Sequence, residues 1–442
     1  MLTLLTLAIL TALGNACVSV RKNVNTFSPT ELQALRDGVA AMKARPVTDP
    51  TSWRYQANIH GTSDTPAQPL WSQCEHGTQF FLSWHRMYLY YFERILRKAS
   101  GNRKLSLPYW NYSDAPANRV LPLPFRNPGD PSNPLFVPGR FINDGSSLPA
   151  SAVDYGTAFS QLDVFDFSFS LEGTPHAAVH VQVGGLMGSV PTAANDPIFW
   201  LHHANIDRLW EGWLGWGEGR HNPEEPHPWL DQTYTFYDEN AQQVSLTGRQ
   251  ILNTRRQLRY RYDSLPPRPS PSPTRATSAP ETRRAVQERR EQRIAENTRL
   301  SLGQAPTTVT LRMEADPAAN LREALERAEG LTSVQLVFEG VDYEPGSYYE
   351  IFINLPGDPA EARSDGPHFA GVIAPFVDPK HAGHALRVNV RPALARLQAQ
   401  GLIGGTDLAL TFVPRGPVPP QGQPPRPVTA RMQAERLSLV IR

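Results

Sequence analysis

Two groups of histidines in this chain have spacings that could bring imidazole rings onto metal ions. In one group, His176 and His180 stand four residues apart and so share one helix face, and a third histidine arrives from the run 195–203. The other group lies upstream in the order H-x15-H-x8-H and consists of His60, His76 and His85. Neutral imidazole is the commonest metal ligand in proteins. The two trios therefore predict a pair of metal ions.

The ligand type restricts which metals these trios would hold. Neither trio includes a carboxylate, whereas di-iron bundles use Glu together with Glu-x-x-His, and binuclear hydrolytic sites use Asp or Glu to bridge their ions. All-imidazole ligation suits copper, which also binds most tightly among the first-row divalent ions. Two coppers, each with three imidazoles and an open position, can bind dioxygen between them. The pattern favours oxidation, and a zinc-dependent hydrolase is the alternative that would need carboxylates near the trios.

The histidines are placed by segments whose apolar spacing predicts helices. Residues 30–43 have apolar side chains on one face behind a Ser-Pro start, and residues 78–98 are so rich in aromatic residues that this helix is expected to be buried nearly all round. Residues 172–181 and 198–213 supply a second pair, while residues 108–170 are mostly loop. The first half therefore predicts a mainly α domain, a four-helix bundle around the dicopper centre with long loops.

The second half of the chain has a different pattern. Residues 266–280 contain little besides Pro, Ser, Thr, Arg and Ala, which is typical of a linker, and the charged segment 285–297 is expected to form a short exposed helix. Apolar residues then recur with a period of two, which predicts seven short strands and a small all-β sandwich. The strands are expected over residues 308–313, 334–338, 348–355, 368–373, 386–390, 408–413 and 437–441.

These patterns divide the 442 residues into four parts. We expect a signal peptide or N-terminal anchor over residues 1–20, a dicopper catalytic domain over 21–263, a Pro/Arg-rich linker over 264–305 and a C-terminal β-sandwich over 306–442. The apolar run 2–13 is too short to span a bilayer and lacks a preceding Lys or Arg, so a buried N-terminal strand explains it as well as a signal segment does. A secreted or periplasmic location and a cytoplasmic one both stay open.

The composition limits which classes of binding partner are expected. Lys plus Arg number 43 and Asp plus Glu number 42, so no net field favours nucleic acid or an anionic membrane, and small neutral ligands are expected. The chain has only two cysteines, Cys17 and Cys74, which excludes a disulfide framework. Cys74 therefore invites a chemical explanation rather than a structural one.

The motifs around the histidines resemble those of the type 3 copper proteins, the family of tyrosinases, catechol oxidases and hemocyanins. His85 stands in F-x-x-W-H-R-x-Y-L, which is similar to the family's first copper motif, and residues 196–210, DPIFWLHHANIDRLW, are nearly identical to its second. The resemblance covers residues 21–262 and implies two copper ions. It implies that one copper is held by His60, His76 and His85, and the other by His176, His180 and His203, with His202 as a neighbour.

The resemblance also implies roles for residues beside the ligands. Cys74 precedes His76 by two positions, the spacing at which fungal and molluscan members form a thioether crosslink. Glu172 matches the acidic residue that orders a water and helps to take the proton from a phenol. Ala177 stands where members active on monophenols often have Asn, which predicts stronger oxidation of o-diphenols than hydroxylation of monophenols. Access to the site is expected to depend on Ala177, Val181 and Val190.

The C-terminal part resembles the C-terminal domain of plant polyphenol oxidases in segments such as 337–341, 349–356 and 411–415, and Tyr260-Arg261-Tyr262 resembles the tyrosine motif that closes the catalytic domain there. In that family the C-terminal domain covers the copper site until an activating protease removes it, and an exposed linker is where a protease would cut. The resemblance thus implies a latent, copper-dependent tyrosinase or catechol oxidase that uses dioxygen to oxidise small phenols. A hemocyanin-like oxygen carrier without turnover is the alternative.

Overall fold

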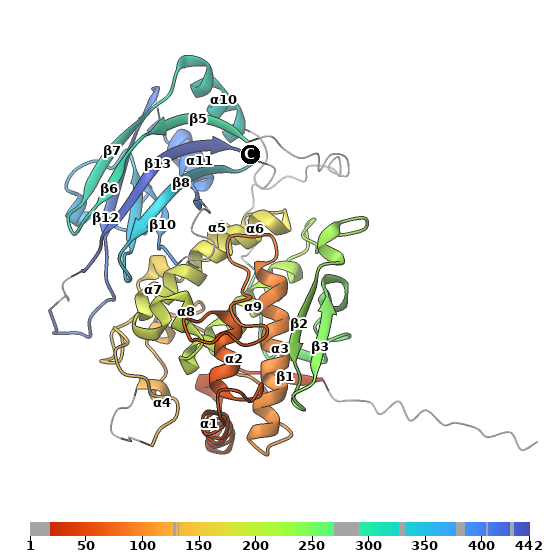
Figure 1. Cartoon of the computed structure of the whole chain (residues 1–442). Coiled ribbons are helices and arrows are strands. Elements are labelled where there is room, and N and C mark those ends of the chain that lie inside the picture. Colours follow the sequence, from red (N-terminus) through yellow and green to blue (C-terminus); the bar gives the residue numbers. More distant parts are fainter. Residues whose placement is uncertain are drawn as a thin grey trace, which may run out of the picture.

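The computed structural model describes residues 18–126, 130, 132–268, 291–326, 332–376, 385–403, 405–424 and 428–442. These residues form a helical unit and a unit of two β-sheets that packs on one end of it (Figure 1). The apolar run 2–13, most of the predicted linker core 266–280 and the first part of the segment 285–297 lie outside the described residues.

Four helices with their adjoining turns carry the histidines of the two predicted trios. They are α2 (Trp53–His60), α3 (Phe81–Ala99), α7 (Ala178–Val183) and α9 (Pro197–Gly215). The flanking helix α1 (Pro29–Lys43) matches the predicted amphipathic helix. It begins with a capping box, in which the Ser28 hydroxyl accepts from the N–H of Glu31 and the Glu31 carboxylate accepts from the N–H of Ser28.

The helices α3 and α9 form the centre of this unit. In α3, 14 of 19 residues are buried, and in α9 16 of 19 are buried, as expected for helices surrounded by protein. Asp196 begins α9 by accepting a hydrogen bond from the N–H of Ile198, and Pro197 occupies the first helical position. The prediction of a central helix buried nearly all round is confirmed for α3.

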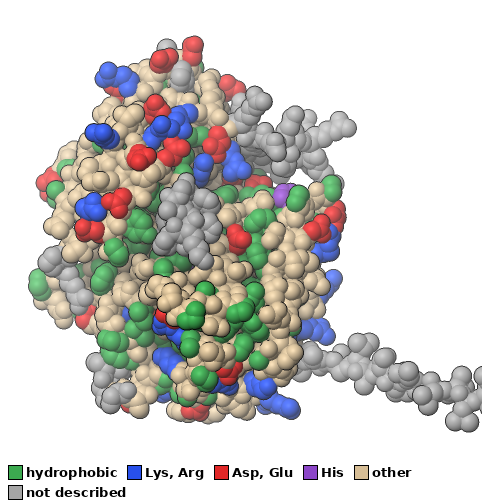
Figure 2. Space-filling view, viewed as in Figure 1, with side chains coloured by type: hydrophobic (Ala, Val, Ile, Leu, Met, Phe, Trp, Pro, Cys, Tyr) green, Lys and Arg blue, Asp and Glu red, His purple; other side chains and the backbone are tan. Residues whose placement is uncertain are grey.

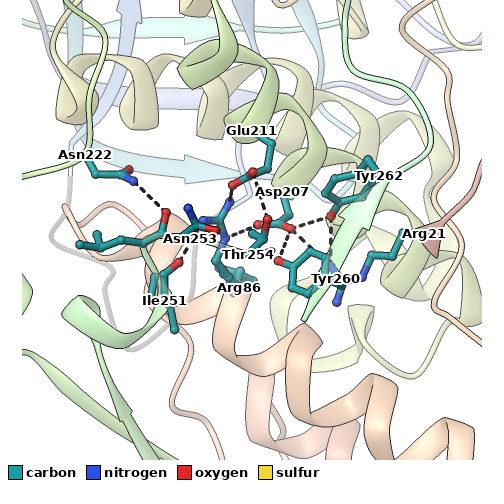
Figure 3. A network of polar contacts seen from close by, with 12 residues as sticks. Arg21, Arg86, Asp207, Glu211, Asn222, Ile251, Asn253, Thr254, Tyr260 and Tyr262 are labelled. Atoms are coloured by element: carbon teal, nitrogen blue, oxygen red, sulfur yellow. Dashed lines mark hydrogen bonds and ion pairs between the residues drawn. The ribbon is translucent and has the colours of Figure 1, made fainter. Parts of the chain in front are cut away.

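A buried network of charges joins α3 and α9 to both chain ends of the helical unit (Figure 3). Strand β1 (Ser19–Arg21) pairs in parallel with strand β4 (Tyr260–Tyr262). Asp207 on α9 accepts hydrogen bonds from the hydroxyls of Tyr260 and Tyr262, each at 2.6 Å. It also forms ion pairs with Arg86 on α3 at 2.6 Å and with Arg21 at 3.3 Å. The network therefore closes the helical unit on itself.

The C-terminal unit is a β-sandwich with a second apolar core. One sheet has the strand order β10-β9-β12-β7 and the other the order β11-β8-β13-β5, with β6 also paired to β13. The strands are β5 (Gln292–Asn297), β6 (Leu300–Leu302), β7 (Thr307–Arg312), β8 (Val334–Tyr343), β9 (Tyr349–Ile353), β10 (Phe369–Ile373), β11 (Leu386–Asn389), β12 (Asp407–Pro414) and β13 (Met432–Ile441).

All seven predicted strands are present, so the predicted sandwich is confirmed, and the structure adds elements to it. The strands β5 and β6 lie within residues that were predicted as linker. The exposed helix predicted over 285–297 is wrong for residues 292–297, which form β5 because Ile294 and Ala295 are buried in the sandwich core. Two helices, α10 (Ala315–Glu326) and α11 (Arg391–Ala399), accompany the sheets. Their apolar side chains, among them Leu321 and Leu394, belong to the same core.

The two units are fastened by a buried polar contact, which we call the clasp, formed by Ser151, Tyr348, Glu350 and Arg415. The Ser151 hydroxyl donates to Glu350 at 2.6 Å and accepts from the Tyr348 hydroxyl at 2.9 Å, and Arg415 Nε donates to Glu350 at 3.1 Å. Nearby, Ser147 and Val418 form two backbone hydrogen bonds, at 2.8 and 2.9 Å. The clasp thus joins a loop of the helical unit to β9 and to the end of β12.

The surface is mixed in charge. On the face shown in Figure 2, acidic and basic side chains are interspersed over the C-terminal unit. Ion pairs of this unit include Arg431–Asp342 and Arg436–Glu339. Among the residues that the structure describes, no helix combines the length and the apolar character needed to cross a membrane.

Candidate metal centre

Seven histidines form one buried cluster inside the helical unit. His60 ends α2, His76 lies in the loop before α3, and His85 lies on α3. Two more histidines come from α7 and the turn before it, and two from α9; these are His176, His180, His202 and His203. Each of the seven is at most 3% exposed. The structure therefore brings all six predicted ligands, and His202 beside them, into one place.

Residues Glu172–Ala177 form a kinked turn where an α-helix was expected over 172–181. Within this turn the backbone of Thr174 is extended, with φ −146° and ψ 122°, and the α-helix resumes at Ala178. The ring centroids of His176 and His180 lie 4.7 Å apart, so the turn keeps both imidazoles on one side.

Backbone carbonyls hold four of the rings through Nδ1. The contacts are His85 with Phe81 O at 2.8 Å, His180 with Met187 O at 2.9 Å, His176 with Glu172 O at 3.1 Å and His60 with Val190 O at 3.2 Å. A carbonyl oxygen only accepts, so each of these Nδ1 atoms carries the proton. Each Nε2 then keeps its lone pair, and the ring is fixed in the tautomer that a metal-binding histidine needs.

The inward nitrogens fit metal ions. The Nε2 atoms of His85 and His176 are buried and have no hydrogen-bond partner, which is costly unless something else binds them. The Nε2 atoms of His180 and His203 are 3.2 Å apart. Two imidazoles that bind one ion at about 2.0 Å with a tetrahedral angle have nitrogens roughly 3.3 Å apart. The donor set, imidazole nitrogen alone, is one that copper accepts.

The two sequence trios meet face to face. The rings of His85 and His203 are nearly parallel, at 10°, with centroids 4.5 Å apart, and those of His76 and His176 are 5.5 Å apart. Ligand atoms of His60, His85 and His203 all lie within 4.8 Å of one another, although His203 belongs to the other trio. Two ions held by the trios would therefore be close neighbours.

Burial keeps these imidazoles neutral. It lowers the pKa of His85, His176, His180 and His203 well below the usual value, and the neighbouring imidazoles add to this effect. Burial also lowers the pKa of His202 to about 3. Only the neutral imidazole binds a metal ion, so the cluster is in its binding form at neutral pH.

The Cys74 thiol lies against one of the predicted ligands. Its Sγ is 3.4 Å from Nδ1 of His76, and both side chains are buried. The Cys-x-His spacing thus corresponds to a side-by-side arrangement of thiol and imidazole.

Glu172 and Ala177 both line a cavity of about 730 Å³ that opens between the two units. Oε1 of Glu172 accepts a hydrogen bond from the N–H of Gly77 at 2.7 Å, and burial raises the pKa of Glu172 to about 8. Val181 and Val190 are buried and are not among the residues that line this cavity. The carbonyl of Val190 instead contacts His60.

Phe376, which sequence reasoning did not single out, lies directly over the histidine cluster. Its ring stacks on His180 with centroids 4.0 Å apart at 15°, and it meets His76 and His176 edge-on, each at 5.7 Å. Phe376 comes from the C-terminal unit, just after β10, yet it belongs to the apolar core of the helical unit. An aromatic residue in a loop gives no signal in the sequence, because its position depends on how the two units dock.

Comparisons with known proteins agree with this geometry. The family model "Common central domain of tyrosinase" matches residues 50–146 and 142–215, and the "Polyphenol oxidase middle domain" matches residues 225–274. A tyrosinase of Hahella sp. (strain CCB-MM4) is 34% identical over 58% of this chain and 66% of its own length. The latent, chloroplastic polyphenol oxidase of Prunus armeniaca is 27% identical over 87% of this chain and 70% of its own length.

The fold matches solved structures over both units. A structure of latent apple tyrosinase has a TM-score of 0.63 at 22% identity, covering 96% of this chain and 97% of that one. The chain spans about two thirds of the length of the two curated relatives named above. The predicted family is confirmed: the chain belongs to the copper-dependent tyrosinase and polyphenol oxidase family.

Proposed function

We propose that this protein is a dicopper oxidase that oxidises o-diphenols with dioxygen, two o-diphenols and one O₂ giving two o-quinones and two waters. The observation that carries the proposal is the buried cluster of imidazoles, because the metal-binding groups in the described residues contain His and Cys but no carboxylate. Relatives named tyrosinase and polyphenol oxidase support the same enzyme class.

The ligand assignment follows from the two trios. We assign one copper to His60, His76 and His85, and the other to His176, His180 and His203. The backbone contacts at Nδ1 support this assignment, because they leave Nε2 available and prevent the rings from turning. A thioether between Cys74 Sγ and a ring carbon of His76 would stiffen one ligand further; its formation releases two protons and two electrons, which dioxygen accepts.

Bound copper would supply the electron transfer to dioxygen, and the protein supplies the surroundings. The buried walls exclude water, and the fixed imidazoles orient the ions. We propose that Glu172 takes the proton of a phenol, directly or through a water, at Oε2, because Oε1 is engaged by Gly77. With Ala177 beside the first ligand of the second copper, we expect hydroxylation of monophenols to be the weaker activity.

The C-terminal unit is proposed to be a cover that keeps the enzyme latent. Phe376 stacks on His180 at the mouth of the cluster, where a phenol ring would have to enter. The Phe376 ring thus occupies space that the ring of a bound phenol would need. An activating protease would be needed to free the cover from the catalytic unit.

Copper reconstitution followed by an assay tests the proposal. We expect two coppers per chain and oxidation of 4-methylcatechol that increases after limited proteolysis. His85→Ala and His203→Ala should each lower the copper content and abolish oxidation, whereas His202→Ala should keep two coppers. A His203→Ala variant with full copper content would refute the ligand assignment. A protein with two coppers that reversibly binds oxygen but oxidises no catechol after cleavage would instead be an oxygen carrier.

A further inference from the structure

His202 is close enough to the second metal position to become a ligand itself. Ligand nitrogens of His176, His180, His202 and His203 all lie within 4.8 Å of one another. The His202 ring is nearly parallel to that of His176, at 19°, and nearly perpendicular to that of His180, at 88°. A fourth imidazole on that ion would occupy the position that a substrate oxygen needs. The site therefore requires something that keeps His202 off the metal.

A chain of hydrogen bonds behind His202 has a direction that is fixed at its far end. Arg208 is buried and only donates, so its Nη1, 3.2 Å from Asn205 Oδ1, identifies that atom as the amide oxygen. The amide nitrogen of Asn205 then points the other way and donates to Ser113 at 3.4 Å. The buried Tyr112 hydroxyl is influenced by this amide, which opposes the rise of its pKa on burial, and His202 Nδ1 is the hydrogen-bond acceptor that the described residues offer to its proton.

The direction continues to His202. A buried O–H group without an acceptor is costly, so the Tyr112 proton goes to His202 Nδ1, 2.9 Å away. A neutral imidazole that accepts at Nδ1 carries its proton on Nε2. That Nε2 is buried and has no hydrogen-bond partner, so no acceptor competes for its proton and no donor supplies another. The four proposed ligands whose Nδ1 contacts a backbone carbonyl have the opposite tautomer, with the proton on Nδ1; they are His60, His85, His176 and His180.

We propose that Tyr112 is a positioning residue that keeps the proton on Nε2 of His202 and thereby excludes His202 from the second metal. This inference rests on the proposed metal site. A protonated Nε2 has no lone pair for a metal, so the second ion keeps three imidazoles and one open position. His202 remains as a packed wall against His176 and His180.

Removal of the Tyr112 hydroxyl should let the tautomer change. In Tyr112→Phe nothing donates to Nδ1, and a metal ion can then recruit Nε2 of His202. Cobalt(II) and azide serve as probes, because cobalt is coloured and azide reports an open position. All arms carry Phe376→Ala so that the cover does not limit azide. The first trio acts as an internal reference, because among the described residues the Tyr112 ring contacts Trp110 and His202 and none of the first trio.

The expected results separate positioning from simple destabilisation. In the Phe376→Ala protein, the cobalt ion held by the second trio should bind azide. The added Tyr112→Phe substitution should weaken azide binding by at least about tenfold while cobalt still binds both sites. Tyr112→Phe/His202→Phe should restore azide binding, because the competing imidazole is gone. Tyr109→Phe, which removes a buried hydroxyl that donates to Asp263 instead, should leave azide binding unchanged.

Three outcomes overturn the inference. Unchanged azide binding in Tyr112→Phe would show that the hydroxyl does not control the open position. Loss of azide binding that the double variant fails to restore would mean that Tyr112 acts only through folding. Failure of the Phe376→Ala protein to bind cobalt at either trio would remove the metal site and, with it, the proposed function.

Discussion

Glu172 can contribute to this site in two separable ways. Its Oε1 accepts the N–H of Gly77, the residue after His76, and so ties the turn that carries His176 to the loop of the other trio. The residue also lines the cavity, and its pKa of about 8, raised by burial, is suited to proton transfer near neutral pH. A single substitution to Ala would remove both contributions together.

Substitution by Gln separates them. Glu172→Gln keeps a carbonyl oxygen for Gly77 but cannot take a proton, so copper content should be unchanged, while kcat/KM for a monophenol should fall by about 100-fold or more and that for an o-diphenol by much less. Glu172→Ala should in addition lower the copper content, because the loop of His76 loses its tie. Metal analysis and assays on both substrate classes measure this. Equal losses on both substrates in Glu172→Gln would mean that the residue is structural.

Single residues were predictable from the sequence where local spacing encodes the chemistry. His85 and His203 stand in short motifs, His176 and His180 are four residues apart, and His60 and His76 were selected by their spacing before His85. Cys74 and Glu172 were singled out through the family resemblance. Phe376 and Tyr112 could not be found in that way, because Phe376 meets His180 across nearly 200 positions and Tyr112 meets His202 across 90. Such contacts exist only once the chain has folded, and neither residue has a distinctive neighbour in sequence.

At the scale of elements, the pairing of β1 with β4 does more than join two short strands. It brings Arg21, Tyr260 and Tyr262 onto Asp207, a residue of the same helix that carries His203. Burial alone would raise the pKa of Asp207, but Arg86 and Arg21 hold it below its usual value. The carboxylate therefore contributes stability at neutral pH that is lost only as the pH falls through this lowered pKa, below about 4.

Removal of Arg21 should be costly for the helical unit. Arg21→Ala leaves the charges of Asp207 and Glu93 buried with one partner fewer, and we expect a loss of about 3–5 kcal/mol in the free energy of unfolding at pH 7. The matched control is Arg54→Ala, which breaks the exposed pair with Asp64 and should cost about 0–1 kcal/mol. Denaturant titration of both proteins measures the difference. Similar small losses in both would mean that β1 is not needed to hold the unit.

The sequence predicted long or regular elements and failed for short or mixed ones. The helices α1, α3 and α9 span four or more turns, and the seven predicted strands are short apolar runs separated by turn residues. The helix α2 was not predicted because polar and apolar residues alternate over its eight positions, a period that is typical of a strand and not of a helix. The helices α10 and α11 were not predicted either, because each has few apolar residues and these pack between strands of the same core.

At the scale of the whole molecule, the cover is held by more than its tether. A linker only raises the local concentration of the C-terminal unit, and cutting it leaves the intrinsic affinity unchanged. The clasp, the backbone pairing of Ser147 with Val418 and the burial of Phe376 all contribute to that affinity. Glu350 and Ser151 are each at most 4% exposed, so their contact is shielded from water. Release of the cover therefore depends on these contacts as well as on the tether.

We predict that cleavage and loss of the clasp act together. A protease site introduced within residues 269–290 should, after cleavage, raise catechol oxidation several-fold, and cleavage combined with Ser151→Ala should raise it further. Ser151→Ala leaves Glu350 and the Tyr348 hydroxyl short of one partner, at a cost of about 1–3 kcal/mol, which shifts the docking equilibrium by about 5- to 150-fold.

The control Glu344→Ala removes a carboxylate that pairs with Arg431 on the exposed surface of the same unit, and should change neither latency nor copper content. Activity assays with size-exclusion chromatography distinguish a docked from a released cover. If the cleaved Ser151→Ala protein separates into two folded units and the copper-loaded catalytic unit is no more active than the intact chain, the C-terminal unit is not what keeps the enzyme latent.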